Sequence, residues 1–360
     1  MRVILILILL SKFLFSLEKN NPNIVKVTNN ESLEIVSMLQ GNIGSKSQLT
    51  TVPVNIKFMK SFPLGTTPLI FNLGLNSFSG KTKLSSYSEF VPINDISFEK
   101  DRAKILLDNA YFKIKAAKDL NIILGLVDTK EYGMDGLGKI EGLGDYRNGF
   151  ISTHFLKPLA LHSLEQRDYY AIPILGSSII LSENFNLKSY VTFGMPTEHI
   201  FFRNSWGLEA NLKTSFGGSY LVHLGFADTE FSYTHHISPA ILLGIEQLIV
   251  QNFGMFFKYS QAEKHKVSKF FTDIQRSWNF GIFYSSDNEI EKSVHYFGLG
   301  LSNVKPFEID ESETLLEIIY RFKLNEFIQL SPDLQFIYSP NGREGELILI
   351  WGLRLFSVII

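Results

Sequence analysis

The chain has 360 residues, of which 45% are hydrophobic and 19% are charged, and it contains no cysteine. The apolar content excludes an intrinsically disordered chain, and the lack of cysteine excludes a disulfide scaffold and a thiolate metal or redox site. The formal net charge is -2 without a basic tract, so we expect no nucleic-acid partner.

The first residues have the features of a secretory signal peptide. Met1 and Arg2 form a minimal basic region, the aliphatic run 3–10 follows, and Ser16 supplies a small residue for cleavage. A transmembrane anchor is the alternative, but Lys12 ends the apolar run well short of the roughly 20 residues that a spanning helix needs. We predict a signal peptide at 1–16, an N-terminal lead segment at 17–31 and a single domain at 32–360.

The rest of the sequence alternates with period two, which is typical of β-strands with two different faces. In 200–214, for example, Trp206 and Leu208 alternate with Gly207 and Glu209. We predict about sixteen strands and assign the weaker segment 149–157 to a loop. The predicted strands are 32–42, 51–62, 67–78, 103–115, 119–128, 170–182, 185–195, 200–214, 218–228, 238–250, 252–262, 271–284, 294–304, 312–323, 328–339 and 345–359.

The connections between these segments fall into two classes. Short ones recur, as at 116–119 and 182–184, while the others include the long stretches 79–102 and 129–169. One rim of tight turns and one rim of long loops is typical of an outer-membrane barrel, whereas a soluble β-sandwich gives no reason for such sorting. We therefore predict an all-β fold, a transmembrane antiparallel β-barrel with short periplasmic turns and long extracellular loops.

The two faces of the strands support the same fold. Aromatic residues near the strand ends fit the girdles of a membrane barrel, although the core of a soluble β-protein gives a similar pattern. The opposite face is polar, and either a solvated outer surface or a water-filled lumen explains it; only the lumen also explains the loop lengths. The predicted pore-lining residues are Lys57, Lys113, Lys188, Glu209, Glu246, Lys258, Glu317, Arg321, Asp333, Gln335 and Arg354, and Lys115 and His223 share the same face.

The C-terminal third resembles a known family. The segments 313–322, 330–342 and 351–354 contain Tyr320-Arg321, Pro332-Asp333 and a final Gly352-Leu353-Arg354. They resemble the closing strands of the carbohydrate-selective porins, the OprB-like family, and a looser collinear resemblance begins at about residue 33. The order Ser339-Pro340-Asn341-Gly342 and the aliphatic end Val358-Ile359-Ile360 depart from that pattern. The resemblance implies a barrel that passes sugars and leaves sugar specificity in doubt.

Two roles are open for the charged wall. Its carboxylate, amide and guanidinium groups can exchange hydrogen bonds with a passing sugar, or they can form an ion-pair network that braces the barrel. For Glu317, Asp333 and Arg354 both roles remain open. The resemblance also implies a constriction by an inward-folded loop, whereas a mobile surface loop is the alternative. The candidate constriction residues are Glu131, Asp135, Lys139, Glu141, Asp145 and Arg147.

Catalytic motifs are incomplete in this sequence. Gly80-Lys81-Thr82 lacks the upstream glycine of a phosphate loop, and a barrel esterase or protease with dispersed residues is a minor alternative. We predict a porin of the bacterial outer membrane, not an enzyme, without a cofactor, whose partners are small saccharides and outer-membrane lipid. Monomer and homotrimer are both open. The alternative function is a surface-exposed adhesin or receptor that acts through the loops 79–102 and 129–169.

Overall fold

The computed structural model describes residues 31–43, 49–50, 54–63, 69–79, 104–127, 172–193, 201–231, 234–263, 274–287, 292–307 and 309–359. All of them belong to one unit, Glu31–Ile360. The predicted signal peptide, the lead segment up to Asn30 and the six candidate constriction residues lie outside the described residues. Within the described ranges, no helix has the length and apolarity to cross a bilayer.

The described residues form one antiparallel sheet. Its strands are β1 (Glu31–Ile43), β2 (Leu49–Thr50), β3 (Val54–Pro63), β4 (Leu69–Ser79), β5 (Lys104–Ala117), β6 (Leu120–Val127), β7 (Ile172–Ser182), β8 (Phe185–Phe193), β9 (Phe201–Lys213), β10 (Gly218–Phe231), β11 (Thr234–Val250), β12 (Phe253–Ala262), β13 (Ile274–Ser285), β14 (His295–Pro306), β15 (Glu313–Lys323), β16 (Ile328–Tyr338) and β17 (Leu347–Ile359). A short 3-10 helix, η5 (Pro340–Gly342), lies between β16 and β17.

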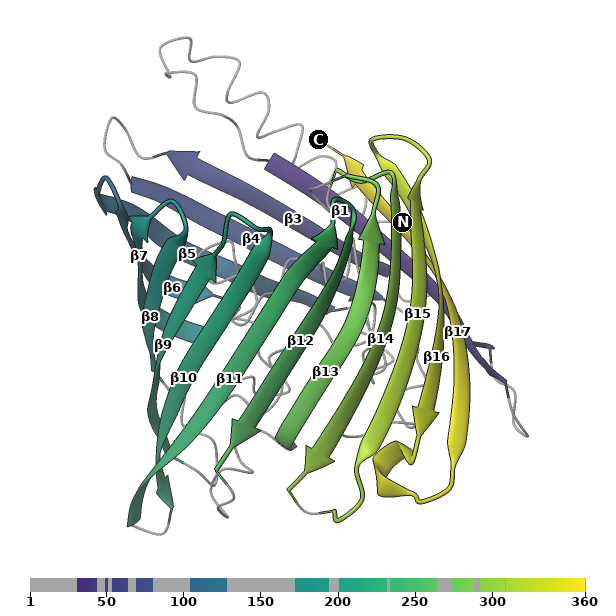
Figure 1. The fold of residues 1–360 in the computed structure, drawn as a ribbon. Helices are drawn as coiled ribbons and strands as arrows, with labels where there is room; N and C mark the ends of the chain where they lie inside the picture. Colours follow the sequence, from purple (N-terminus) through teal and green to yellow (C-terminus); the bar gives the residue numbers. More distant parts are fainter. Residues whose placement is uncertain are drawn as a thin grey trace. The chain divides into compact units, whose positions relative to one another are not determined.

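The sheet closes on itself. β1 pairs with β17 from Leu33↔Ile359 to Ile43↔Leu349, and its other edge pairs with β3 and, beyond it, with the two-residue β2. The remaining strands pair with their sequence neighbours, so every long strand described has two partners, and the strands surround a common interior (Figure 1). Closure removes the unpaired edges that an open sheet would present. The predicted barrel of about sixteen strands is confirmed, and the short β2 is an addition to it.

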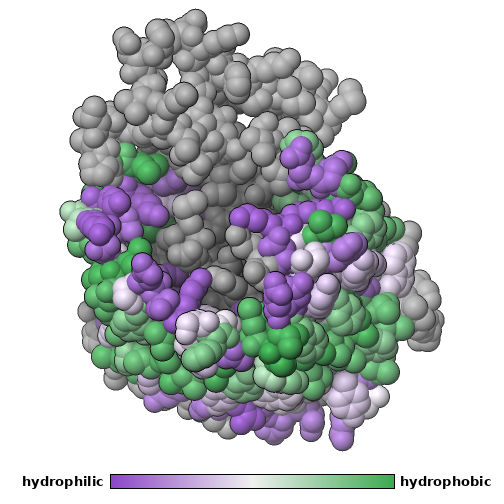
Figure 2. Space-filling model, turned by 45° about the horizontal axis from the view of Figure 1, so that its top comes forward, coloured by the Kyte–Doolittle hydropathy of each residue, from purple (hydrophilic) through white to green (hydrophobic). Residues whose placement is uncertain are grey.

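The strands bury polar residues and expose apolar ones, the reverse of a water-soluble protein. On β17, Leu353 and Leu355 are exposed, whereas the alternate residues Gly352, Arg354 and Phe356 are buried. In a closed cylinder the buried face is the inner one. Figure 2 shows a hydrophobic band on the outside with hydrophilic side chains gathered along its borders. An apolar outer band and a polar interior are the properties of a transmembrane barrel.

Connections at the two ends of the cylinder differ in length: those at one end are mostly short, and those at the other end are mostly longer. The turn rim, uppermost in Figure 1, holds the tight connections 118–119, 183–184, 214–217, 251–252 and 324–327. It also holds the longer β13–β14 connection, 286–294, close to the gap 285–293 between the predicted strands 271–284 and 294–304. The opposite loop rim includes the long connections 80–103 and 128–171, which lie outside the described residues, and the short connection 232–233.

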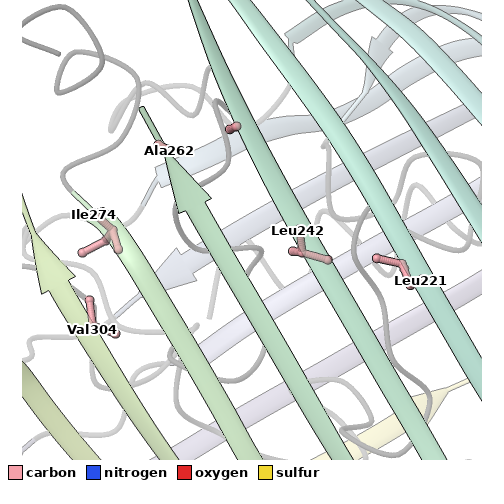
Figure 3. Close-up of a cluster of buried hydrophobic side chains, with 6 residues drawn as sticks. Leu221, Leu242, Ala262, Ile274 and Val304 are labelled. Atoms are coloured by element: carbon pink, nitrogen blue, oxygen red, sulfur yellow. The ribbon is translucent and has the colours of Figure 1, made fainter. Parts of the chain in front are cut away.

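The inner wall formed by the described residues also has an apolar part, which the prediction of a polar inner face did not include. Buried aliphatic side chains come from the five adjacent strands β10 to β14 and form one cluster (Figure 3). Phe307 packs against this cluster. The cluster consists of Leu221, Ala240, Leu242, Ala262, Ile274 and Val304. Buried charged residues lie on both sides of this cluster, on β8–β10 and β15–β17, and also on β11 and β12, where Glu246 and Lys258 are buried.

Candidate functional site in the barrel interior

The predicted pore-lining residues lie mainly on the inner wall. Buried there are Lys188, Glu209, Glu246, Lys258, Glu317, Arg321, Asp333, Gln335 and Arg354, each at most 8% exposed. Lys113 on β5 is half-buried. Lys57 has a described backbone position on β3, where it pairs with Glu34 and Asn76, and its side chain lies outside the described part. The structure thus brings most of these residues to one surface.

A row of interacting polar side chains crosses β8, β9 and β10. Cα pairing places Lys188 opposite Glu209 and Glu209 opposite His223. Lys188 Nζ lies 3.5 Å from Glu209 Oε1, and His223 Nδ1 lies 3.1 Å from Glu209 Oε2. The Tyr190 hydroxyl is 3.2 Å from His223 Nε2, and Asn211 Nδ2 donates to Glu209 Oε1 at 2.9 Å. We call Lys188, Glu209, His223 and Tyr190 the β8–β10 cluster.

A glycine positions the tyrosine of this cluster. Gly207 is the Cα partner of Tyr190, and a Cβ at position 207 would lie 2.5 Å from the tyrosine ring. The ring therefore rests directly on the glycine, close to the strand backbone, and its hydroxyl reaches the histidine. A side chain at 207 would push the ring away and break the contact with His223.

Arg321 fastens the β13–β14 connection from β15. Its Nη2 donates to the Ser293 carbonyl oxygen at 3.0 Å, its Nη1 donates to Gln329 Oε1 at 3.4 Å, and its guanidinium carbon lies 5.7 Å from the centre of the Tyr296 ring. The Ser293 hydroxyl in turn accepts from the Ser286 backbone N–H at 2.9 Å. Arg321 therefore has a bracing role on the turn rim.

Asp333, Gln335 and Arg354 lie side by side on β16 and β17. Gln335 Nε2 donates to Asp333 Oδ2 at 2.9 Å, and Arg354 Nη2 donates to Ser331 Oγ at 3.1 Å. Gly352 is the Cα partner of Asp333, and a Cβ at this position would overlap the Asp333 carboxylate. The final Gly-Leu-Arg of the sequence thus makes room for one charged group and supplies another.

Tyr296 on β14 is fully buried and is the Cα partner of Arg321 on β15. Glu317 on β15 and Arg354 on β17 are also fully buried. The inner wall from β14 to β17 therefore carries both acidic and basic groups.

Comparison with known proteins begins from a negative result, because no family model and no curated protein matches the sequence. Solved structures do match. OprB of Pseudomonas putida in its high-pH structure has a TM-score of 0.72 at 13% identity, covering 92% of this chain and 94% of that one. The outer membrane channel DcaP of Acinetobacter baumannii has a TM-score of 0.59 at 11% identity, covering 92% and 97%. OmpF of Salmonella typhi, solved with daunomycin, has 0.60 at 9% identity, again covering 92% and 97%.

This chain has the porin fold. The structural similarity to OprB agrees with the resemblance seen in the C-terminal strands, and it extends over nearly the whole chain. By its fold and its apolar outer band the chain is a transmembrane β-barrel with porin architecture. At these low identities the similarity concerns the fold.

Several inner-wall residues of this porin fold were not singled out from the sequence. Tyr190 follows Lys188 at the next position of the same parity, and Glu313 and Tyr296 are likewise buried on inner faces. The alternation of inward and outward positions along each strand would have identified all three. It would not have shown that Tyr190 meets His223, because that contact depends on the register between β8, β9 and β10.

Proposed function

We propose that the chain is an outer-membrane porin through which small hydrophilic solutes diffuse passively, with mono- and oligosaccharides as the substrate class. The observation that supports this most directly is a closed antiparallel cylinder whose inner wall carries charged and amide side chains while its outer face is apolar. A solute gradient suffices to drive such transport, so the residues need only lower the barrier to passage.

The balance of inner charges favours neutral polyhydroxyl solutes over ions of one sign. Among the described buried residues, four cationic side chains face five anionic ones, with His223 in addition. They are Lys188, Lys258, Arg321 and Arg354 against Glu209, Glu246, Glu313, Glu317 and Asp333. A sugar hydroxyl both donates and accepts, so it can use either sign, and each exchange for water changes the free energy by only about 1 kcal/mol. Weak multiple contacts favour flux over retention.

The constriction belongs to the same proposal. Glu131, Asp135, Lys139, Glu141, Asp145 and Arg147 are the residues we propose to narrow the path, as the family resemblance implies. Single alanine substitutions, followed by measurement of single-channel conductance, test this proposal. Substitution of a residue at the constriction should change the conductance, whereas substitution of a residue in a surface loop should leave it unchanged.

Reconstitution into planar bilayers tests the proposed function. We expect the purified protein to open stable pores whose current is partly blocked by glucose or maltose. Folded protein that inserts but leaves the membrane silent would contradict the proposal. That result would favour an adhesin or receptor that acts through the loops 79–102 and 129–169.

A further inference from the structure

Large apolar side chains are exposed in or beside the hairpin turns of the turn rim. Phe216, in the β9–β10 turn, is 84% exposed, more than any other large apolar residue described. Leu181 stands at the β7–β8 turn, Val250 at the β11–β12 turn and Val294 in the β13–β14 connection, and each is about half exposed. In the β15–β16 turn, Leu324 and Phe327 are exposed as well. Thus five hairpins in a row expose a large apolar residue in the turn or within two residues of it, although turns in contact with water favour polar residues.

The turn that displays Phe216 is held rigidly. The Thr214 hydroxyl accepts from the Gly218 N–H at 3.0 Å, and Gln247 Nε2 on β11 donates to the Phe216 carbonyl oxygen at 2.9 Å. Gly217 has φ +73°, and a Cβ there would lie 2.9 Å from Leu248. The backbone around Phe216 is therefore fixed by both its own hairpin and the neighbouring one, so that the exposed phenyl ring is presented in a defined place.

An equivalent arrangement holds the β15–β16 turn. Asn325 Oδ1 accepts from the backbone N–H groups of both Phe327 and Ile328 at 2.8 Å. The side-chain cap fixes the backbone beside Phe327 with its apolar ring exposed. Two separate hairpins thus use polar side chains to stabilise turns whose tips are apolar.

The apolar tips continue the lipid-facing surface of the same strands. Leu181 follows the exposed Ile179 on β7, and the exposed Ile249, next to Val250, follows Ile245 on the outward face of β11. A single protein partner would contact one side of the rim, whereas these tips are distributed along it, as a planar surface requires. Figure 2, which brings this rim forward, shows mainly hydrophilic residues along it with a few hydrophobic ones among them.

We propose that the turn rim is a membrane-anchoring surface, with its tips immersed at the boundary between the headgroups and acyl chains of a phospholipid leaflet. Apolar side chains at that depth leave water while the turn backbone stays near the headgroups. The tight turns would then lie level with the membrane surface. This inference concerns membrane depth and is independent of the solute that the barrel conducts.

Site-specific fluorescence tests the depth of Phe216. The chain has no cysteine, so Phe216→Cys carries one environment-sensitive label in the full-length protein, folded into phosphatidylethanolamine–phosphatidylglycerol vesicles. Glu344→Cys, exposed on the loop rim, is the matched control. We expect blue-shifted emission at 216, several-fold stronger quenching by spin-labelled lipid and several-fold weaker quenching by iodide than at 344. Equal iodide quenching at both positions would overturn the proposal, as would disulfide cross-linking of unlabelled Phe216→Cys between copies.

A second pair of variants measures anchoring without a label. Phe216→Asp and Ser215→Asp place the same charge at adjacent exposed positions of one turn. We expect Phe216→Asp to unfold from vesicles at a clearly lower urea concentration than Ser215→Asp. Only the substitution at 216 removes an apolar side chain from the lipid boundary. Equal midpoints would overturn the proposal. Conductance of both variants, recorded in parallel, keeps this result separate from the test of the proposed function.

Discussion

A buried charge on the inner wall destabilises the fold unless it has well-placed partners, and Glu209 is the clearest example. It is 1% exposed and faces Lys188 on one side and His223 on the other. An ion pair removed from water repays its desolvation only when its partners are well placed. Glu209 has those partners on both neighbouring strands, so the β8–β10 cluster depends on this one carboxylate.

Glu209→Gln is expected to destabilise the barrel by roughly 3 kcal/mol, because it removes the carboxylate that faces the buried Lys188. The temperature at which the folded band disappears in heat-modifiability gels measures this loss. Lys188→Met combined with Glu209→Gln should recover part of it, since both charges are then gone. A double variant less stable than either single variant would contradict coupling between the two residues.

Substitutions of Asp333 and Arg354 test whether these charged residues interact with passing solutes or only stabilise the barrel. Asp333→Ala removes an anion from the interior and should shift ion selectivity toward anions, while Arg354→Ala should shift it toward cations. Reversal potentials in a salt gradient, together with block by maltose, measure both shifts, and heat-modifiability should show that the barrels still fold. If the variants fail to assemble, Asp333 and Arg354 are braces and the solute contacts lie elsewhere.

At the scale of elements, the β13–β14 connection shows how a buried arginine controls a turn. Arg321 on β15 reaches the Ser293 carbonyl oxygen, Gln329 and the face of Tyr296. A planar guanidinium can donate in several fixed directions, which an ammonium group cannot match. The longest connection described on the turn rim is therefore held from a strand outside its own hairpin.

Arg321→Met should loosen residues 286–294 while the neighbouring turns keep their protection. Hydrogen exchange read by mass spectrometry measures this, with the β11–β12 turn, Gln251 and Asn252, as the internal reference. Arg321→Lys should fail to restore protection, because one ammonium group cannot replace the separate contacts. Unchanged exchange in both variants would show that the connection is stable without Arg321.

The elements were predictable because strand alternation is a local property. β17 was expected at 345–359 and runs from Leu347 to Ile359. The aliphatic cluster of the wall was not predictable, since β11 carries leucine on both faces at this point: Leu242 is buried and Leu243 is exposed. The contact between Tyr190 and His223 also escaped prediction, because it joins β8 to β10 and depends on two registers.

At the scale of the whole molecule, closure by β1 and β17 determines the environment of every other strand. The seam pairs Leu39 with Leu353 and Gly41 with Trp351, so the first and last strands have the same kind of neighbours as the rest. Without this seam, two edges would present unpaired N–H and C=O groups to lipid, where each costs several kcal/mol. The pairing of β1 with β17 is therefore what encloses a path through the barrel.

A disulfide across the seam tests closure and register together. In the absence of native cysteine, Leu39→Cys with Leu353→Cys should cross-link on mild oxidation of the folded barrel, because these residues are Cα partners and bridged cysteines need Cα atoms about 4.4–6.8 Å apart. Leu39→Cys with Leu349→Cys is the control, since a shift of four residues along a strand adds about 13 Å. Gel mobility of the denatured, non-reduced protein reports the bridge. Cross-linking of both pairs, or of the control pair alone, would contradict this register, and cross-linking of neither would contradict the closed cylinder.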